Sequence, residues 1–296
     1  MSQLPVLRYQ VVDVFTRNAL EGNALAVFIE PHGIGTETMQ KIAAELNLCE
    51  TVFVTRSQRP DCIARLRIFT PRREMDFAGH PTIGSGFVLL QAGYVPEGET
   101  SFAVEENVGV IPLAIEKPDQ YLIWLRTPPI RDGATVSGAD AAALVGLGDE
   151  ALRECAPQVL NAGNPTLFVA LREPSDVDRA VFDSARWTAL REKYRLEPMC
   201  VFVFAPTPAG AYSRMFAPDY GVPEDPATGS STGPLASYMM RHGLVSPKAG
   251  TRFVSEQGTR MGRRSLLHVH LHGDQGSEGI DVGGFVTPII QGELRL

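Results

Sequence analysis

The sequence predicts an α+β fold in which two similar halves share one chain of 296 residues. Four segments recur in the same order in both halves, and the paired segments are separated by 141 to 149 residues, as Asp76 and Asp225 are. Each half contains several strands with few helices between them, which favours a mixed or antiparallel sheet over a doubly wound one. We place the halves at 1–119 and 120–296, with the tail at about 283–296 as a segment that could join the first half.

The composition is that of a globular protein and excludes several partners. Hydrophobic residues make up 44% of the chain, enough to bury a full core. The net charge of −7 and the pI near 5.4 argue against nucleic acid or an anionic membrane as a partner. The four cysteines show no C-x-x-C spacing, and no apolar run reaches the ~18 residues of a membrane span. We therefore expect a cytoplasmic protein from a reducing compartment.

The first half begins with two predicted strands and a helix. Residues 7–15 and 22–28 have the composition of strands, the second led by a Gly-Asn turn, which suggests an antiparallel pair. Thr36 is placed to cap the helix that follows. The next strand has Glu50 near its start. The apolar face of the helix has the i, i+3, i+4, i+7 spacing of Met39, Ile42, Ala43 and Leu46.

The first half then reaches a helix that we expect to be deeply buried. Alternation over 63–70 predicts a strand, which Pro71 ends. Residues 76–84 lead into a helix that runs to about Gln91. Its small residues 84–86 leave a patch with little side chain, so another element can approach the helix backbone closely.

The second half repeats this order of elements. A Gly-Asn turn and strand at 163–169 come first, then a helix over 184–194. Two strands follow, at 199–204 and 214–218, and the second again ends in a proline. The proline-rich approach over 218–226 is expected to be a loop.

The turn at 223–233 combines carboxylate and hydroxyl side chains with the start of a helix. Pro234 is expected in the first helical turn, and Gly243 is placed to end the helix. Unpaired N–H groups at a helix N-terminus carry roughly half a positive charge, which suits a carboxylate or enolate oxygen. With its counterpart at 77–84, this turn predicts a cleft between the halves that holds a small anionic substrate.

Glu50, His80 and Asp225 supply groups that can move protons in such a cleft. Proton abstraction beside a carboxylate or enone needs a base against the substrate and donors for the developing enolate oxygen. A carboxyl shielded from water can have its pKa raised towards ~6–7, which suits it for this task. Neither a metal nor a nucleotide cofactor is then required, and the phosphate-loop patterns are absent from the sequence.

Four motifs in this order resemble the PhzF-like family, named for the phenazine-biosynthesis isomerase, and the match spans nearly the whole chain. The resemblance implies a diaminopimelate-epimerase-like fold, with each half a mostly antiparallel, barrel-like sheet around a central helix. The motifs are Glu-Gly-Asn-Ala-Leu-Ala-Val-Phe from Glu21, Asn-Leu-Cys-Glu-Thr-Val-Phe-Val from Asn47, Phe-Ala-Gly-His-Pro-Thr-Ile-Gly from Phe77 and Asp-Pro-Ala-Thr-Gly-Ser from Asp225.

The resemblance also implies an activity and a set of site residues. The family's isomerase shifts a proton on a dihydro-hydroxyanthranilate without a cofactor, and a homodimer is implied as well. The matching positions imply Glu50 as the acid/base, with His80, Asp225 and Ser230 as the other catalytic residues. Substrate or anion binding is expected at Gly79, Thr228, Gly229 and Ser231.

Two positions bear on related chemistries. Related epimerases and racemases use a pair of thiols, but Ala78 and Thr228 hold those positions here, which argues against two-thiol racemisation. Cys49 stands where the family leads us to expect serine, and it places a thiol beside Glu50.

Three alternatives stay open from the residues. The segment 229–233 fits the G-x-S-x-G pattern of a serine hydrolase with Ser231 as its nucleophile, although the expected loop before it argues against an elbow. His268, His270 and His272 alternate along one strand and would suit a metal, but a solvated strand face is the favoured interpretation, so we expect no metal. A duplicated fold without activity would be a small-acid or protein-binding module.

Overall fold

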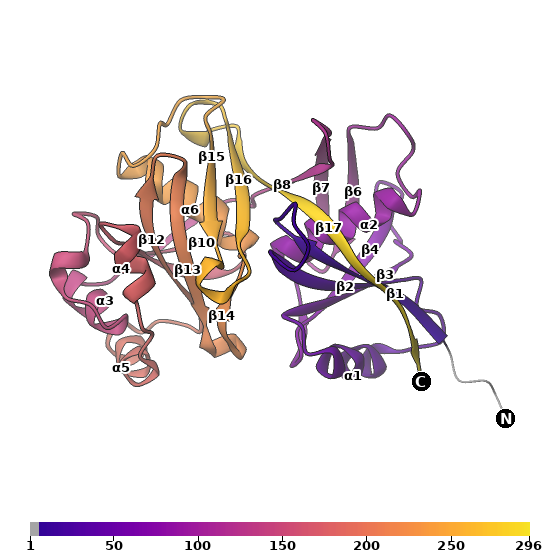
Figure 1. Ribbon diagram of the computed structural model, residues 1–296, viewed down its shortest axis with the longest axis horizontal. Helices are drawn as coiled ribbons and strands as arrows, with labels where there is room; N and C mark the ends of the chain where they lie inside the picture. Colours follow the sequence, from indigo (N-terminus) through magenta and orange to yellow (C-terminus); the bar gives the residue numbers. More distant parts are fainter. Residues whose placement is uncertain (1–5) are drawn as a thin grey trace. The chain divides into compact units, whose positions relative to one another are not determined.

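The computed structural model describes residues 6–296 and divides the chain into two compact units. Unit 1 contains the described residues up to Arg126 together with Gly283–Leu296, and unit 2 contains Thr127–Val282. Both units combine strands with helices (Figure 1), so the predicted α+β class is confirmed. None of the helices described in 6–296 is long and apolar enough to cross a membrane.

Unit 1 is a closed barrel of strands. Its strands are β1 (Val6–Val14), β2 (Asn23–Ile29), β3 (Glu50–Thr55), β4 (Ala64–Phe69), β5 (Glu74–Met75), β6 (Ser101–Glu106), β7 (Gly109–Glu116), β8 (Leu122–Arg126) and the part of β17 (Gly279–Arg295) that begins at Gly283. The ring runs through β1, β2, β3, β4, β6, β7, β8 and β17 and returns to β1. The pairs β2–β3 and β4–β6 are parallel, whereas β1–β2, β3–β4, β6–β7, β7–β8 and β1–β17 are antiparallel.

The central helix of unit 1 is α2 (Gly79–Gln91), which is buried from Gly79 to Leu89. It contacts β1, β2, β3, β4 and β8. A Cβ atom on Gly84 would lie 2.6 Å from a methyl group of Leu25 and 2.8 Å from one of Val14. The predicted close approach to this helix is therefore confirmed, and the strands that require it are β1 and β2.

Helix α1 (Thr36–Leu46) packs against a separate apolar cluster of unit 1, in which Met39, Ile42 and Ala43 contact phenylalanines of β2, β3 and β4. The predicted cap was wrong by one residue, because Gly35 is the N-cap and makes no side-chain cap. The Thr36 hydroxyl instead accepts a hydrogen bond from Arg67, at 3.0 Å. The hydroxyl oxygen that was expected to cap the helix is therefore bound to Arg67 of β4.

Unit 2 repeats this plan. Its strands are β9 (Arg131–Thr135), β10 (Gln158–Asn161), β11 (Pro165–Ala170), β12 (Cys200–Thr207), β13 (Gly210–Ala217), β14 (Val222–Asp225), β15 (Arg252–Gln257) and β16 (Ser265–His272). Its helices are α3 (Gly138–Leu144), α4 (Pro174–Arg179), α5 (Ser184–Tyr194) and α6 (Gly229–Arg241). The pairs β11–β12 and β13–β15 are parallel, as are their counterparts β2–β3 and β4–β6 in unit 1.

The two faces of the unit 2 sheet have separate cores. Helix α6 packs with Leu235, Tyr238 and Met239 against phenylalanines of β11 and β12. Helices α3, α4 and α5 cover the other face (Figure 1), where Trp187 and Leu190 of α5 join valines of β11 and β12. The predicted two-half plan, with mostly antiparallel strands around a central helix, is thus confirmed.

Two local predictions near α6 were wrong. The helix begins at Gly229, so Pro234 is its sixth residue and lies inside the helix rather than in its first turn. Proline has no N–H to donate, so the carbonyl of Ser230 receives no helical hydrogen bond from it. The approach expected as a loop contains the short strand β14, which pairs with β13 despite Pro223. Pairing with a neighbouring strand outweighs the local preference of proline for turns.

Candidate active site

Three polar side chains of unit 1 meet beside the first turn of α2. Glu50 is the first residue of β3 and lies in parallel register with Leu25 of β2. Asn23 comes two residues before Leu25, and its Nδ2 is 3.3 Å from Nδ1 of His80. Nε2 of His80 is 3.3 Å from Oε2 of Glu50. The fold therefore brings together Glu50 and His80, two of the residues predicted to be catalytic.

Burial determines the charge of His80. The imidazole is enclosed by protein, and the loss of hydration lowers the pKa of His80 to about 3. With the Asn23 amide donating to Nδ1, the single ring proton lies on Nε2, which faces Glu50. The contact does not have the geometry of a hydrogen bond, but catalytic contacts of this kind often tighten when a substrate binds.

Glu50 keeps partial access to solvent. Its side chain is 18% exposed, whereas that of His80 is 5% exposed. A carboxyl group held beside a neutral N–H, and open on one side, can exchange a proton with a ligand without competition from an imidazolium. Chemically, the trio suits acid/base catalysis with Glu50 as the proton carrier.

A fourth group of unit 1, Glu106, did not figure among the predicted site residues. It ends β6, is 2% exposed, and its Oε1 lies 2.5 Å from the hydroxyl of Thr82 in α2. Burial raises the pKa of Glu106 to about 8, although the Thr82 hydroxyl and the Ala78 backbone favour the charged form. One sequence pattern could have indicated a buried carboxyl here. Neighbouring residues of a strand face opposite sides, so one residue of the Glu105–Glu106 pair must point inward.

In unit 2, Asp225 belongs to a network at the start of α6. The Thr228 hydroxyl donates to Oδ2 of Asp225 at 2.6 Å. Gln257, at the end of β15, accepts a hydrogen bond from the Thr228 amide at 3.1 Å. Its Nε2 donates to the Thr228 hydroxyl at 3.0 Å and to the Asp225 carbonyl at 2.7 Å. The network fixes Asp225 and Thr228, two predicted site residues, beside Gly229, the first residue of the helix.

The two serines of this turn have different surroundings. Ser230 is partly exposed, and its Oγ lies 3.4 Å from Nδ2 of Asn164. Ser231 is 0% exposed, its hydroxyl is 2.8 Å from that of Thr166, and its amide donates to the Thr228 carbonyl. Both polar groups of Ser231 thus serve the protein itself. This geometry disfavours Ser231 as an anion-binding residue, and it equally disfavours the serine hydrolase, whose nucleophile must be accessible.

The trio of unit 1 has a counterpart in unit 2. Cys200 is the first residue of β12 and lies in parallel register with Thr166 of β11. Asn164 comes two residues before Thr166, and its Nδ2 lies 3.6 Å from the sulfur of Cys200. The side chains of Asn164, Ser230 and Cys200 therefore occupy the positions of Asn23, His80 and Glu50.

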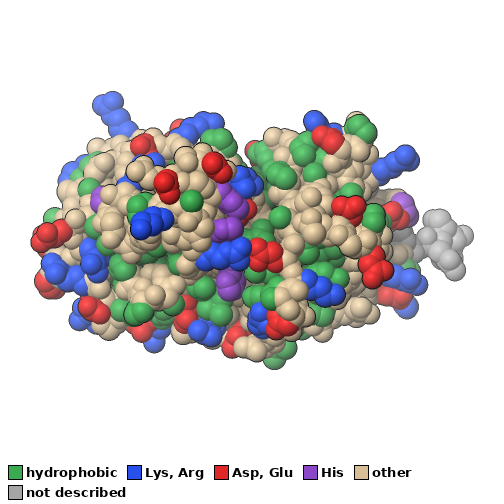
Figure 2. Space-filling view, turned by 90° about the horizontal axis from the view of Figure 1, so that it is seen from above, with side chains coloured by type: hydrophobic (Ala, Val, Ile, Leu, Met, Phe, Trp, Pro, Cys, Tyr) green, Lys and Arg blue, Asp and Glu red, His purple; other side chains and the backbone are tan. Residues whose placement is uncertain are grey.

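Two of the three histidines of β16, which the sequence offered as a metal site, contact charged side chains. His272 contacts Asp281 through Nε2 and Oδ2 at 2.7 Å, and His270 contacts Arg252 at 3.4 Å. Within the described residues 6–296, no group of three or more His, Cys, Asp or Glu side chains has an arrangement that could hold a metal. Figure 2 shows acidic and basic side chains interspersed over the face that it presents, with no single-sign stripe.

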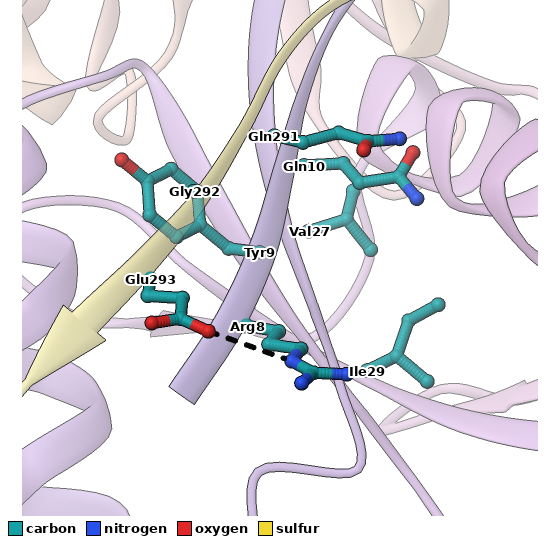
Figure 3. A pocket seen from close by; sticks show the side chains of 8 residues that line it. All are labelled: Arg8, Tyr9, Gln10, Val27, Ile29, Gln291, Gly292 and Glu293. Carbon is teal, nitrogen blue, oxygen red and sulfur yellow. Dashed lines mark ion pairs between the residues drawn. The ribbon is translucent and has the colours of Figure 1, made fainter. Parts of the chain in front are cut away.

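A pocket of about 830 Å³ opens on strands β1, β2 and β17 of unit 1 (Figure 3). None of the predicted site residues lines it, and Arg8 and Glu293 approach each other across it at 3.7 Å. The residues that line it are Arg8, Tyr9, Gln10, Val27, Ile29, Gln291, Gly292 and Glu293.

Comparison with known proteins supports the relationship that the four motifs indicate. The family model described as phenazine biosynthesis-like protein matches residues 12–292. The chain belongs to this family. The trans-2,3-dihydro-3-hydroxyanthranilate isomerase of Pseudomonas aeruginosa is 33% identical over 98% of this chain and 99% of its own length. As a member of the phenazine biosynthesis-like family with such relatives, the chain is an isomerase.

Two solved structures show how far the fold extends. The PhzF-family phenazine biosynthesis protein of Bacillus anthracis has a TM-score of 0.87 at 24% identity and covers 99% of this chain and 100% of its own. A hydroxyproline epimerase from Agrobacterium vitis has a TM-score of 0.66 at 15% identity, with 98% and 93% covered. The fold of the phenazine biosynthesis-like family is therefore shared with epimerases of amino acids.

Proposed function

We propose that this isomerase moves a proton between two carbon atoms of a small carboxylate substrate, without a cofactor, and that Glu50 carries the proton. The observation that supports this most directly is the contact of 3.3 Å between Glu50 Oε2 and the neutral His80 ring. A carboxylate beside a neutral N–H can take a proton and return it, because its neighbour neither neutralises it nor competes for the proton.

The proposed reaction needs no other reagent. Glu50 removes a proton from a carbon next to an unsaturated or carboxylate-bearing centre, and the electron pair of the broken C–H bond moves into the conjugated system. The same carboxyl then returns the proton to a different carbon, so that atoms and electrons balance. Glu50 ends each turnover in the state in which it began, and its partial exposure lets the proton that it carries exchange with solvent before a proton is returned to carbon.

The helix starts supply the positive potential that the developing anion requires. Gly79 at the start of α2 and Gly229 at the start of α6 begin helices whose first N–H groups lack partners within the helix. We propose that these amides hold the substrate carboxylate or the enolate oxygen, each contact contributing about 1 kcal/mol or more. Asp225, Thr228 and Ser230 would orient the substrate.

The substrate class comes from the relatives. The isomerase of Pseudomonas aeruginosa is named for trans-2,3-dihydro-3-hydroxyanthranilate, a small carboxylate that carries a conjugated ring, and this compound is the first substrate to test. The cleft between the halves, the homodimer and the cytoplasmic location remain predictions that accompany this proposal.

Exchange of hydrogen with solvent tests the proposal. Trans-2,3-dihydro-3-hydroxyanthranilate and a panel of related cyclic and acyclic carboxylates would be incubated with the enzyme in D2O, and deuterium at carbon followed by NMR. We expect incorporation with the wild type and a loss of about 10²-fold or more with Glu50→Gln. Glu37→Gln is the matched control, since Glu37 lies on the surface of α1 and pairs with Lys41.

Two results would contradict the proposal. One is exchange by Glu50→Gln at the wild-type rate, which would remove Glu50 as the proton carrier. The other is tight binding of these acids without any exchange by the wild type, which would favour a small-acid-binding module instead.

A further inference from the structure

The hydroxyl of Thr82 has one hydrogen and two very close oxygen neighbours. Its Oγ1 lies 2.6 Å from the carbonyl oxygen of Ala78 and 2.5 Å from Oε1 of Glu106. A carbonyl oxygen can only accept a hydrogen bond, so the Thr82 hydrogen is needed for the contact with Ala78. If Glu106 were an ionised carboxylate, its contact with Thr82 would have no hydrogen between the two oxygens. Two oxygens at that distance require a proton between them.

The opposite assignment fails for the same reason. If the Thr82 hydroxyl donated to Glu106, the Ala78 carbonyl would stand 2.6 Å from an oxygen with no hydrogen to share. Both short contacts are satisfied only when Glu106 is a carboxylic acid that donates to Thr82, while Thr82 donates to Ala78. Counting the hydrogens of these two contacts therefore favours a neutral Glu106.

The surroundings of Glu106 favour the same state. The residue is 2% exposed, and its Oε2 has no hydrogen-bond partner among the described residues 6–296. Burial raises the pKa of Glu106 to about 8 and outweighs the Thr82 and Ala78 hydrogen bonds, which favour the charged form. The adjacent Glu105 turns to Arg65 and Ser57 on the other side of β6. His80 of α2 is held neutral by burial. Within the part of the chain that the structure describes, no cationic side chain is among the groups that shift the pKa of Glu106.

Unit 2 has a neutral side chain in the same role. Gln257 ends β15 as Glu106 ends β6, and it holds the start of α6 through the amide and hydroxyl of Thr228. The Thr232 hydroxyl donates to the Thr228 carbonyl at 2.9 Å, as the Thr82 hydroxyl does to the Ala78 carbonyl. A protonated carboxyl is the closest chemical match to the Gln257 amide, because each offers one acceptor oxygen and one donor group.

We infer that Glu106 is a positioning residue: as a neutral carboxylic acid it fixes the first turn of α2 and leaves the positive end of that helix available to a substrate carboxylate. An ionised Glu106 would place a negative charge at the same helix end and compete with the substrate for it. The inference rests on the proposed function for the identity of the anion. The ionisation state of Glu106 does not depend on the proposed function.

The first experiment measures the charge of Glu106 directly. The wild type and Glu106→Gln would be labelled with ¹³C at the glutamate carboxyl carbon, and the resonance missing from the variant would be titrated by NMR. We expect this carboxyl to titrate near 8. A midpoint in the ordinary range near ~4 would overturn the inference. Glu105→Gln is the matched control, because Glu105 is the next residue of the same strand and pairs with Arg65.

The second experiment measures anion binding, with anthranilate as the probe and calorimetry as the readout. Between about pH 6.5 and about pH 9.5, on either side of the expected midpoint, the wild type should lose about three- to tenfold in affinity as Glu106 ionises. Glu106→Gln should keep its affinity over the same interval, since its side chain stays neutral and can still donate to Thr82.

The two readouts separate this inference from the proposed function. An equal loss of affinity in the wild type and in Glu106→Gln would overturn the role in anion binding. A carboxyl that titrates near 8 in an enzyme that exchanges no hydrogen with any of the tested acids would sustain the neutral Glu106 and contradict only the proposed reaction.

Discussion

Glu50 and Cys200 occupy equivalent positions in the two units. Each is the first residue of a strand that runs parallel to the strand after a Gly-Asn turn. Cys200 lies near Asn164 of its turn, whereas Glu50 lies near His80, which contacts Asn23 of the other turn. The duplication has thus placed a carboxyl in one unit and a thiol in the other. Only the carboxyl has a histidine beside it, because the residue equivalent to His80 is Ser230.

This asymmetry predicts that the two positions contribute unequally to proton transfer. Glu50→Gln should lower kcat by about 10²- to 10⁴-fold, the usual contribution of a general acid or base. Cys200→Ser replaces the thiol by a hydroxyl of similar size and should change kcat by less than about threefold. Steady-state kinetics on any substrate that exchanges hydrogen would measure both, with circular dichroism as the control for folding. A larger loss from Cys200→Ser would show that unit 2 also moves the proton.

The buried His80 predicts a loss of stability in acid. The pKa of His80 is about 3 in the folded protein and near ~6.5 in the unfolded chain, so the unfolded chain binds more protons between these values. The stability that His80 contributes is complete above about pH 6.5 and falls as the pH drops towards 3. In urea titrations over this interval, His80→Gln should show a shallower decline than the wild type. His32→Gln changes an exposed histidine and should behave as the wild type does.

Glu106 predicts the opposite trend at higher pH. Its pKa is about 8 in the folded protein, above the ordinary value of ~4.3, so the folded protein binds more protons between these values. The stability that the buried carboxyl contributes is present below the unfolded pKa and is lost as the pH rises to about 8. Thermal melts from about pH 5 to about pH 9 should show a steeper fall for the wild type than for Glu106→Gln. Parallel curves would contradict a raised pKa.

Gly84 should tolerate no larger side chain without a cost in stability. An alanine Cβ there would lie 2.6 Å from Leu25 and 2.8 Å from Val14, inside a closed barrel. We expect Gly84→Ala to lower the free energy of unfolding by about 1–3 kcal/mol, partly offset by the ~1 kcal/mol gain in helix propensity. Gly86→Ala is the matched control in the same helix, since its nearest neighbour is 3.1 Å away. Chemical denaturation would measure both, and an equal cost would argue against the packing explanation.

The sequence by itself determined the elements and their repetition. Periodicity identified α1, because side-chain spacing follows directly from helix geometry, and composition marked the strands that begin near Glu50 and Cys200. The helix α5 was expected because it holds the same place in the second half. The recurring Gly-Asn turns and helix starts indicated two similar halves. These signals lie within short stretches of chain, where local physical preferences dominate.

Only the tertiary structure decided which polar groups meet and which are charged. Glu50 meets His80 of α2, which in turn contacts Asn23 of β2, and Glu106 is neutral because the closed barrel removes it from water. Pro234 was expected in the first turn of α6, but the helix begins at Gly229, where Gln257 holds the amide of Thr228 from 29 residues further along the chain. Burial and contacts between distant segments set these properties, and neither is encoded in the spacing of neighbouring residues.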